Sequence, residues 1–319
     1  MSFSRDVKEE LSMHIPQARH CQIAEIAAII MYCGHVKITA KDHFSIRVQT
    51  ENLYVARKLF TLLQKTFKIE TENVVRRSEN KKRLVTYVVY VQDARRVLMA
   101  AKLLDSNLQL IENPPLKHNV IVQNDCCRRA FLRGAFLAAG SISDPHRFYH
   151  YEIVCQTSWK AEQLAGLIRS FEIDAKIVKR KNHYVVYVKE GSHIVSLLGL
   201  MEANVSLLNL ENIRILKEMR NSVNRQVNCE AANINKTVNA AVKQIDDITY
   251  IRDTIGLEAL SEGLEEIAGL RLQYPEATLK ELGMMLSPQV GKSGVNHRLR
   301  KLSNLAEELR GSKEENYYD

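Results

Sequence analysis

The sequence YVVYV occurs twice in this chain, at residues 87–91 and again at residues 184–188. A second matching pair lies upstream of each copy, IRVQT at residues 46–50 and IVCQT at residues 153–157. β-Branched and aromatic residues of this kind favour strands. Because a literal repeat indicates a duplicated structural unit, we expect two copies of one fold within the first 210 residues.

Each copy has the same order of predicted elements around these strands. An apolar helix leads into a hairpin, a helix with 3.6-residue periodicity follows, and a second hairpin ends in the YVVYV strand before a closing helix. The helices are predicted at residues 23–33, 53–67 and 93–104 in the first copy and at residues 126–139, 160–171 and 193–201 in the second. The sequence therefore predicts an α+β domain with the order α-β-β-α-β-β-α twice, related by a pseudo-twofold axis.

The leading helix of each copy is rich in small residues and ends at a glycine, IAAIIMYCG at residues 26–34 and LRGAFLAAG at residues 132–140. Small residues allow two helix backbones to approach closely. Glycine after a helix often adopts the left-handed conformation that ends it. We expect the two helices to pack against each other at the pseudo-twofold axis, with Gly34 and Gly140 as left-handed caps.

Positive charge is concentrated in the first two-thirds of the chain. The formal net charge is +8 over 319 residues, yet residues 1–209 hold 30 basic and 20 acidic side chains while residues 210–319 hold 15 and 17. Such an excess is typical of proteins that bind nucleic acid, although a soluble enzyme can also be basic.

Basic residues gather in the second hairpin of each copy. The residues are Arg76, Arg77, Lys81, Lys82 and Arg83 in the first copy and Lys179, Arg180 and Lys181 in the second. They could contact the phosphates of a DNA duplex without reading its sequence. The alternative is that they only keep exposed hairpin tips soluble and protect sheet edges.

Other classes of protein fit the sequence poorly. The longest apolar run, residues 26–33, is far shorter than a membrane-spanning helix, and charged residues at positions 5, 6, 8, 9 and 10 argue against a signal peptide. The six cysteines form no CxxC pair, and Cys126 and Cys127 are interpreted as core thiols of a cytoplasmic protein. We find no nucleophile motif, metal motif or glycine-rich cofactor loop, so no cofactor or metal is predicted.

The last third of the chain is predicted to be helical. Residues 210–236 form an Asn-rich helical segment that either faces DNA or connects two domains, and the connecting role is favoured. Helices are expected at residues 238–254 and 260–273. Thr278 and Glu281 then form a capping box that opens a short helix, and Ser293 is expected to cap a final one. A short helix, a turn and a second helix predict a helix-turn-helix motif over about residues 277–310.

The exposed face of the final helix is basic and carries no acid between Lys292 and Lys301. Recognition helices contact bases mainly through their N-terminal half, and Arg and Asn can form paired hydrogen bonds with guanine and adenine. We predict base contacts by Asn296, His297 and Arg298. The predicted phosphate contacts are Lys292, Ser293, Arg300 and Lys301. The alternative is the ordinary solvated face of an amphipathic helix.

The repeat and its glycine-ended helices resemble the LAGLIDADG homing-endonuclease fold, most clearly in FLRGAFLAAGSIS at residues 131–143. In that family an acidic residue just before the final glycine of each helix ligates the catalytic divalent metal. Cys33 and Ala139 occupy these positions here, and Met31 and Leu137 replace the other motif acid. A methyl group or a soft thiol is a poor substitute for a hard oxygen ligand, so the resemblance implies the fold without the nuclease activity. A residual nuclease would need other acids, such as Glu25 or Asp144.

The whole chain resembles the WhiA family of Gram-positive bacteria. The most distinctive matches are NRQVNCEAAN at residues 224–233 and KSGVNHRLRK at residues 292–301. The resemblance implies a LAGLIDADG-like domain at residues 1–209 (repeats at about 20–105 and 125–209), a linker at 210–236, a helix-turn-helix domain at 237–312 and a tail at 313–319.

The same resemblance implies a non-enzymatic regulator of transcription tied to cell division, chromosome segregation and, in sporulating relatives, sporulation. Its expected partner is double-stranded DNA, with transcription or division proteins as further partners, no membrane and a cytoplasmic, nucleoid-associated location. Since the pseudo-dimer lies on one chain, we expect a monomer and a non-palindromic site. The rival hypothesis is a cell-division interaction protein in which DNA binding is secondary.

Overall fold

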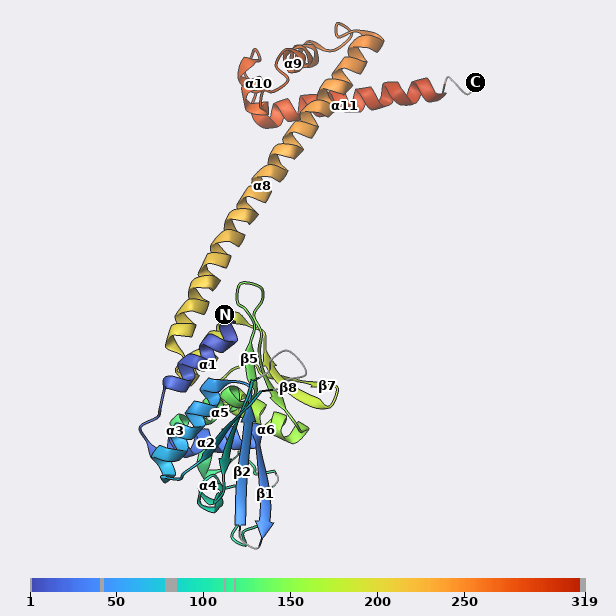
Figure 1. The fold of residues 1–319 in the computed structure, drawn as a ribbon. Helices are drawn as coiled ribbons and strands as arrows, with labels where there is room; N and C mark the ends of the chain where they lie inside the picture. Colours follow the sequence, from blue (N-terminus) through green and yellow to red (C-terminus); the bar gives the residue numbers. More distant parts are fainter. Residues whose placement is uncertain (1, 41–42, 78–84, 112, 118, 316–319) are drawn as a thin grey trace. The chain divides into compact units, whose positions relative to one another are not determined.

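The structure is a computed structural model that describes residues 2–40, 43–77, 85–111, 113–117 and 119–315. The chain forms two compact units, Met1–Glu218 and Met219–Asp319 (Figure 1). Within the described ranges, no helix is both long enough and apolar enough to cross a membrane.

The first unit contains the duplicated fold. The first repeat consists of α2 (Arg19–Cys33), β1 (Gly34–Ala40), β2 (His43–Thr50), α3 (Leu53–Phe67), β3 (Glu72–Arg77), β4 (Val85–Val91) and α4 (Arg95–Ala100). The second consists of α5 (Asp125–Ala139), β5 (Gly140–Ile142), β6 (Tyr151–Cys155), α6 (Ser158–Arg169), β7 (Lys176–Arg180), β8 (His183–Val188) and α7 (Gly191–Met201). A short 3-10 helix, Val120–Val122, precedes α5. The predicted order α-β-β-α-β-β-α is confirmed in both repeats.

Each repeat builds its own antiparallel sheet of four strands, with the orders β1-β2-β4-β3 and β5-β6-β8-β7. The YVVYV segments lie in β4 and β8, which are central strands with a neighbour on both sides. Val89 pairs with Val48 in the first sheet, and Val186 pairs with Ile153 in the second. Because a central strand packs against two strands and a layer of helices, its side chains are more constrained than those of an edge strand.

Helices α2 and α5 pack against each other at the centre of this unit, as the small residues predict. A Cβ atom on Gly134 of α5 would lie 2.5 Å from the backbone oxygen of Glu25 in α2. The predicted left-handed caps are wrong, because Gly34 and Gly140 have φ angles of −89° and −88° in the extended region. Lack of space explains why glycine occupies these positions, since a Cβ on Gly34 would lie 2.6 Å from the backbone oxygen of Ile30.

A helix that the sequence analysis missed, α1 (Phe3–Met13), opens the first unit. Ser2 caps it, and Val7 and Leu11 are buried. The recurrence of apolar residues every four positions could have revealed it. The Glu10 carboxylate accepts hydrogen bonds from the backbone N–H groups of Val205 (2.7 Å) and Ser206 (2.9 Å), at the start of α8 (Asn204–Ile255). Glu10 therefore satisfies donors that a helix N-terminus leaves without partners.

The remaining helices are α8 (Asn204–Ile255), α9 (Glu262–Gln273), α10 (Leu279–Met285) and α11 (Lys292–Glu315). The Asn-rich helical segment predicted at residues 210–236 and the helix predicted at residues 238–254 are parts of one continuous helix, α8, of 52 residues. It contains no proline or glycine, and it ends where Gly256 takes a positive φ of 82°. Every residue from 219 to 240 is exposed, so this stretch gains no stability from burial within either unit.

Candidate nucleic-acid interface

Helix α10 begins with the predicted capping box. The Thr278 side chain accepts a hydrogen bond from the Glu281 backbone N–H (3.3 Å), and the Glu281 carboxylate accepts one from the Thr278 N–H (2.7 Å). Hydrogen bonds from Thr278 to the Glu281 carboxylate lower the pKa of Glu281. The chain therefore enters α10 in a defined direction before turning toward α11.

A small apolar core holds α9, α10, α11 and the C-terminal part of α8 together. Its buried members are Ile248, Ile251, Ile267, Ala268, Leu282, Leu286, Val295, Leu299, Leu302 and Ala306. Two hydrogen bonds fix the turn between α10 and α11. The Val290 N–H donates to the Gly283 oxygen (2.9 Å), and the Ser287 N–H donates to the Glu266 carboxylate of α9 (2.9 Å). The turn therefore packs on a third helix, which fixes the placement of α11.

Gly283 is expected to be essential for this turn. A Cβ there would collide with the backbone oxygen of Val290, whereas a Cβ on Gly269 of α9 would meet no atom within 4 Å. We expect Gly283→Ala to destabilise the second unit by about 1–3 kcal/mol through overpacking. Gly269→Ala is the matched control and is expected to be neutral or stabilising by up to about 1 kcal/mol. Hydrogen exchange over residues 279–306 measures both, and equal protection in the two variants would contradict the packing.

The predicted recognition residues lie on α11. Exposed side chains are Lys292, Ser293, Asn296, His297, Arg300 and Lys301. Arg298 differs, because its guanidinium donates a hydrogen bond to the Gly263 oxygen of α9 (3.2 Å) and the residue is half-buried. This contact favours a positioning role for Arg298 and leaves Arg300 as the more accessible arginine. The prediction that Ser293 caps α11 is wrong, since the helix begins at Lys292.

The C-terminal half of α11 is engaged in ion pairs with α8. Glu307 pairs with Lys243 (3.0 Å), and Arg310 pairs with the buried Asp247 (2.8 Å) while lying 4.8 Å from the ring centroid of Tyr250. The basic residues of the N-terminal half, from Lys292 to Lys301, have no acid beside them in sequence. The two halves of α11 therefore differ in role, since one packs on α8 while the other presents positive charge to solvent.

The basic hairpins of the first unit are split between two faces. Strands β3 and β7 are sheet edges. Because side chains alternate along a strand, Arg76 and Arg77 point to opposite faces, as do Lys179 and Arg180. Lys181 lies in the following turn with φ 52°. Three of the predicted phosphate contacts fall outside the described residues: Lys81, Lys82 and Arg83.

The face of the first sheet that points away from the helices carries a row of basic and polar residues. The register pairs Arg47 with His35 and with Tyr90, and the Arg47 guanidinium lies 5.9 Å from the Tyr90 ring centroid. Arg76 donates to the Tyr90 hydroxyl (3.3 Å). Arg47 was not predicted from the sequence, although its position between two buried residues, Ile46 and Val48, could have identified it.

The equivalent face of the second sheet carries an acid, Glu152. Its carboxylate lies 3.0 Å from His150 Nε2 and 3.1 Å from Arg180 Nη1, and the Ser141 hydroxyl donates to it (3.2 Å). Burial alone would raise the pKa of Glu152, but these partners outweigh burial and lower it. The register also places Glu72 beside Tyr90 on the outer face of the first sheet, so an acid lies among the basic residues on this face of both sheets.

The positions of the nuclease acids have no oxygen ligand to offer. The Cys33 thiol donates to the Ile29 oxygen (3.3 Å), burial raises its pKa to about 12, and Ala139 provides only a methyl group. Glu25 is fully buried and pairs with Lys58 (3.0 Å) and Arg133 (3.3 Å), so it cannot replace the missing acids. Asp144 lies in an exposed loop and accepts a hydrogen bond from the His146 N–H (3.0 Å).

Helix α1 packs beside these positions. The Ser4 hydroxyl accepts a hydrogen bond from the Ile142 N–H (3.2 Å), and Lys8 Nζ lies 5.7 Å from the Phe136 ring centroid. Burial lowers the pKa of Lys8 to about 8, with Cys33 opposing the shift. A lysine therefore lies close to Cys33, one of the positions where the LAGLIDADG resemblance implies a metal-ligating acid.

The low pKa of Lys8 predicts that replacing this lysine stabilises the first unit by an amount that depends on pH. In the unfolded chain the pKa of Lys8 is about 10.4, whereas in the folded chain it is about 8. The charged amine therefore lowers the free energy of unfolding below about pH 8, and this loss shrinks as the pH rises toward 10.4. We expect Lys8→Met to stabilise the first unit by about 1–2 kcal/mol at pH 7 and by less at pH 9.5. Urea unfolding followed by Trp159, the chain's single tryptophan, measures this. An equal gain at both pH values, or a loss at pH 7, would contradict the prediction.

Comparison with known proteins covers almost the whole chain. Residues 19–105 match the family model described as the WhiA N-terminal LAGLIDADG-like domain, residues 128–220 the WhiA LAGLIDADG-like domain, and residues 223–306 the WhiA C-terminal HTH domain.

Relatives of similar length share high identity with the chain. "Probable cell division protein WhiA" of Lachnoclostridium phytofermentans is 58% identical over 97% of this chain and 100% of its own length. The protein of the same name from Alkaliphilus oremlandii is 47% identical over 99% and 100%. The crystal structure of full-length DUF199/WhiA from Thermatoga maritima superposes with a TM-score of 0.60 at 25% identity, covering 97% of this chain and 99% of that one. The chain belongs to the WhiA family.

Proposed function

We propose that this chain is a non-enzymatic DNA-binding regulator of transcription that reads DNA with the N-terminal half of α11. One observation carries the proposal, the exposed and acid-free face from Lys292 to Lys301 on the second helix of a packed helix-turn-helix. Exposed Asn296, His297 and Arg300 have the donors that base edges accept, and the flanking lysines suit phosphates. Arg298, held against α9, orients this helix.

The biological setting of the proposal is cell division. Relatives of the chain are named "Probable cell division protein WhiA", which supports a role in division. The proposal adds roles in chromosome segregation and, in sporulating hosts, in sporulation. In this proposal the protein is a cytoplasmic, nucleoid-associated monomer. Residues 237–312 read the DNA sequence, and residues 210–236 link this domain to the first. Residues 1–209 form a platform that contacts the phosphates of the DNA.

The platform role rests on the first sheet. Its outer face presents Arg47 and Arg76 beside Tyr90. Such residues bind phosphates without sequence preference and raise affinity in a salt-dependent way. The absence of oxygen ligands at Cys33 and Ala139 supports a platform that does not cleave the DNA it contacts.

Fluorescence anisotropy on labelled genomic fragments, over a salt series with Mg²⁺, tests the proposal. We expect the wild type to select certain fragments and Arg300→Ala to lose about 1–3 kcal/mol on those fragments. Arg252→Ala is the matched control, because Arg252 is an exposed arginine of the same unit on α8. Equal binding of every fragment by all three proteins would contradict sequence reading by α11. Nicking of the probes would revive the nuclease hypothesis.

A further inference from the structure

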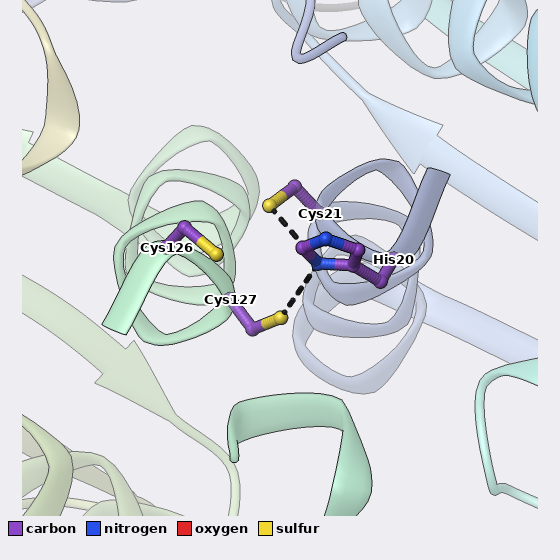
Figure 2. Close-up of side chains that lie close together, drawn as sticks. All are labelled: His20, Cys21, Cys126 and Cys127. Carbon is purple, nitrogen blue, oxygen red and sulfur yellow. Dashed lines mark hydrogen bonds between the residues drawn. The ribbon is translucent and has the colours of Figure 1, made fainter. Parts of the chain in front are cut away.

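Four potential metal ligands meet where α2 and α5 begin. Figure 2 shows His20 and Cys21 of α2 facing Cys126 and Cys127 of α5. His20 Nδ1 lies 3.1 Å from Cys127 Sγ and 3.4 Å from Cys21 Sγ, and the ligand atoms of all four residues lie within 4.8 Å of one another. Cys21 and Cys127 are buried, whereas Cys126 is exposed. The interpretation of Cys126 as a core thiol is therefore wrong.

The four residues are two equivalent pairs related by the internal repeat. Cys21 and Cys127 each lie thirteen residues before the glycine that follows their helix, Gly34 or Gly140, and His20 and Cys126 each lie one residue earlier. Each repeat thus supplies two ligands from the same two positions, and the pairs face each other across the α2–α5 contact. A tetrahedron has the same twofold symmetry, so the repeat itself provides a tetrahedral arrangement of donors.

The donor set is that of a structural zinc site. Three thiolates and one imidazole form one of the common zinc sets, with Zn–S distances of about 2.3 Å and Zn–N distances of about 2.0–2.1 Å. Neighbouring ligand atoms of such a tetrahedron lie about 3.4–3.8 Å apart, so the cluster needs only small side-chain adjustments. Sulfur ligands disfavour Mg²⁺ and Ca²⁺.

We propose that His20, Cys21, Cys126 and Cys127 bind one zinc ion that links the first turn of α2 to that of α5. The site is separate from the positions of the nuclease acids, which lie about 20 Å away at the other ends of the same helices. Four protein ligands leave no coordination position for water, so the ion has a structural role. It joins two segments 105 or more residues apart in the chain and stabilises the first unit.

Metal titration of the reduced, chelator-treated full chain tests the site. We expect one Co²⁺ per chain with the charge-transfer absorption of thiolate ligands, displaced by one Zn²⁺. Cys126→Ser is expected to weaken Zn²⁺ binding at least about 100-fold. Cys229→Ser is the matched control, because Cys229 is an exposed thiol on α8 outside the cluster, and its binding should equal that of the wild type.

Urea unfolding distinguishes loss of the metal from loss of the fold, and mass spectrometry detects oxidation of the cluster. Since Cys126 is exposed, metal-free Cys126→Ser should unfold in urea like the metal-free wild type when followed by Trp159, and Zn²⁺ should raise only the wild-type midpoint. Failure of the wild type to bind Zn²⁺ stoichiometrically, or equal binding by Cys126→Ser, would overturn the proposal. Mass spectrometry that shows a disulfide within the cluster and no bound metal in freshly isolated protein would also overturn it.

Discussion

Replacing Lys58 by methionine is expected to lower the free energy of unfolding of the first unit by about 3–5 kcal/mol. Lys58 is buried in α3, where its ammonium lies 3.0 Å from the Glu25 carboxylate and donates to the backbone oxygens of Leu11 (2.9 Å) and His14. The substitution leaves Glu25 with Arg133 as its remaining cationic partner and leaves both backbone oxygens without this donor. The loss is large because the buried Glu25 carboxylate loses its nearer cationic partner and two backbone oxygens lose a hydrogen-bond donor.

Urea unfolding followed by Trp159 measures this loss, because that residue lies in α6 of the first unit. Lys65→Met is the matched control, since Lys65 is an exposed lysine on the same helix, and its effect should stay within about 0.5 kcal/mol. Burial raises the pKa of Glu25, and Lys58 opposes that shift. A variant without Lys58 should therefore regain part of its stability at pH 5, where Glu25 takes up a proton more readily. Similar free energies of unfolding for Lys58→Met and Lys65→Met would contradict a stabilising role for the buried contacts of Lys58.

Reversing two charges on α11, Arg300→Glu with Lys301→Glu, is expected to weaken binding to a selected DNA fragment at least about 100-fold at 100 mM salt. Both side chains are exposed on the predicted recognition helix. The change removes two cations and places two anions against the phosphates, and each like-charge contact costs affinity. The DNA affinity of the variant should also fall less steeply with rising salt concentration than that of the wild type.

A control with the same change in net charge separates local contact from overall charge. Arg57→Glu with Lys65→Glu alters two exposed residues of α3, on the helical side of the first sheet. This variant should bind the selected fragment within about threefold of the wild type, since screening weakens distant charges. Equal losses in both variants would mean that net charge, rather than α11, governs binding.

The sequence predicted the elements whose residues interact locally. The duplicated YVVYV strands, the α3 boundaries and the Thr278–Glu281 capping box follow from alternation, periodicity and spacing within a few residues. Helices were predicted separately at residues 210–236 and 238–254, but no proline or glycine lies between them, and they form the unbroken α8.

Features made by residues distant in sequence could not be predicted. The Glu25–Lys58–Arg133 contacts join three helices. The contact between Arg298 and Gly263 depends on how α9 packs against α11. The cluster at His20 and Cys127 escaped motif reasoning because each repeat supplies only two adjacent ligands. All three depend on packing between elements, about which spacing along the chain carries no information.

The central claim is that one helix of this chain reads a short DNA sequence. Selection from a random duplex library with the full chain, followed by sequencing, tests it most directly. We predict enrichment of one short, non-palindromic motif by the wild type and by the Arg57→Glu, Lys65→Glu control, and no enriched motif with Arg300→Glu, Lys301→Glu. The same motif from the α11 variant, or no motif from the wild type, would contradict the claim.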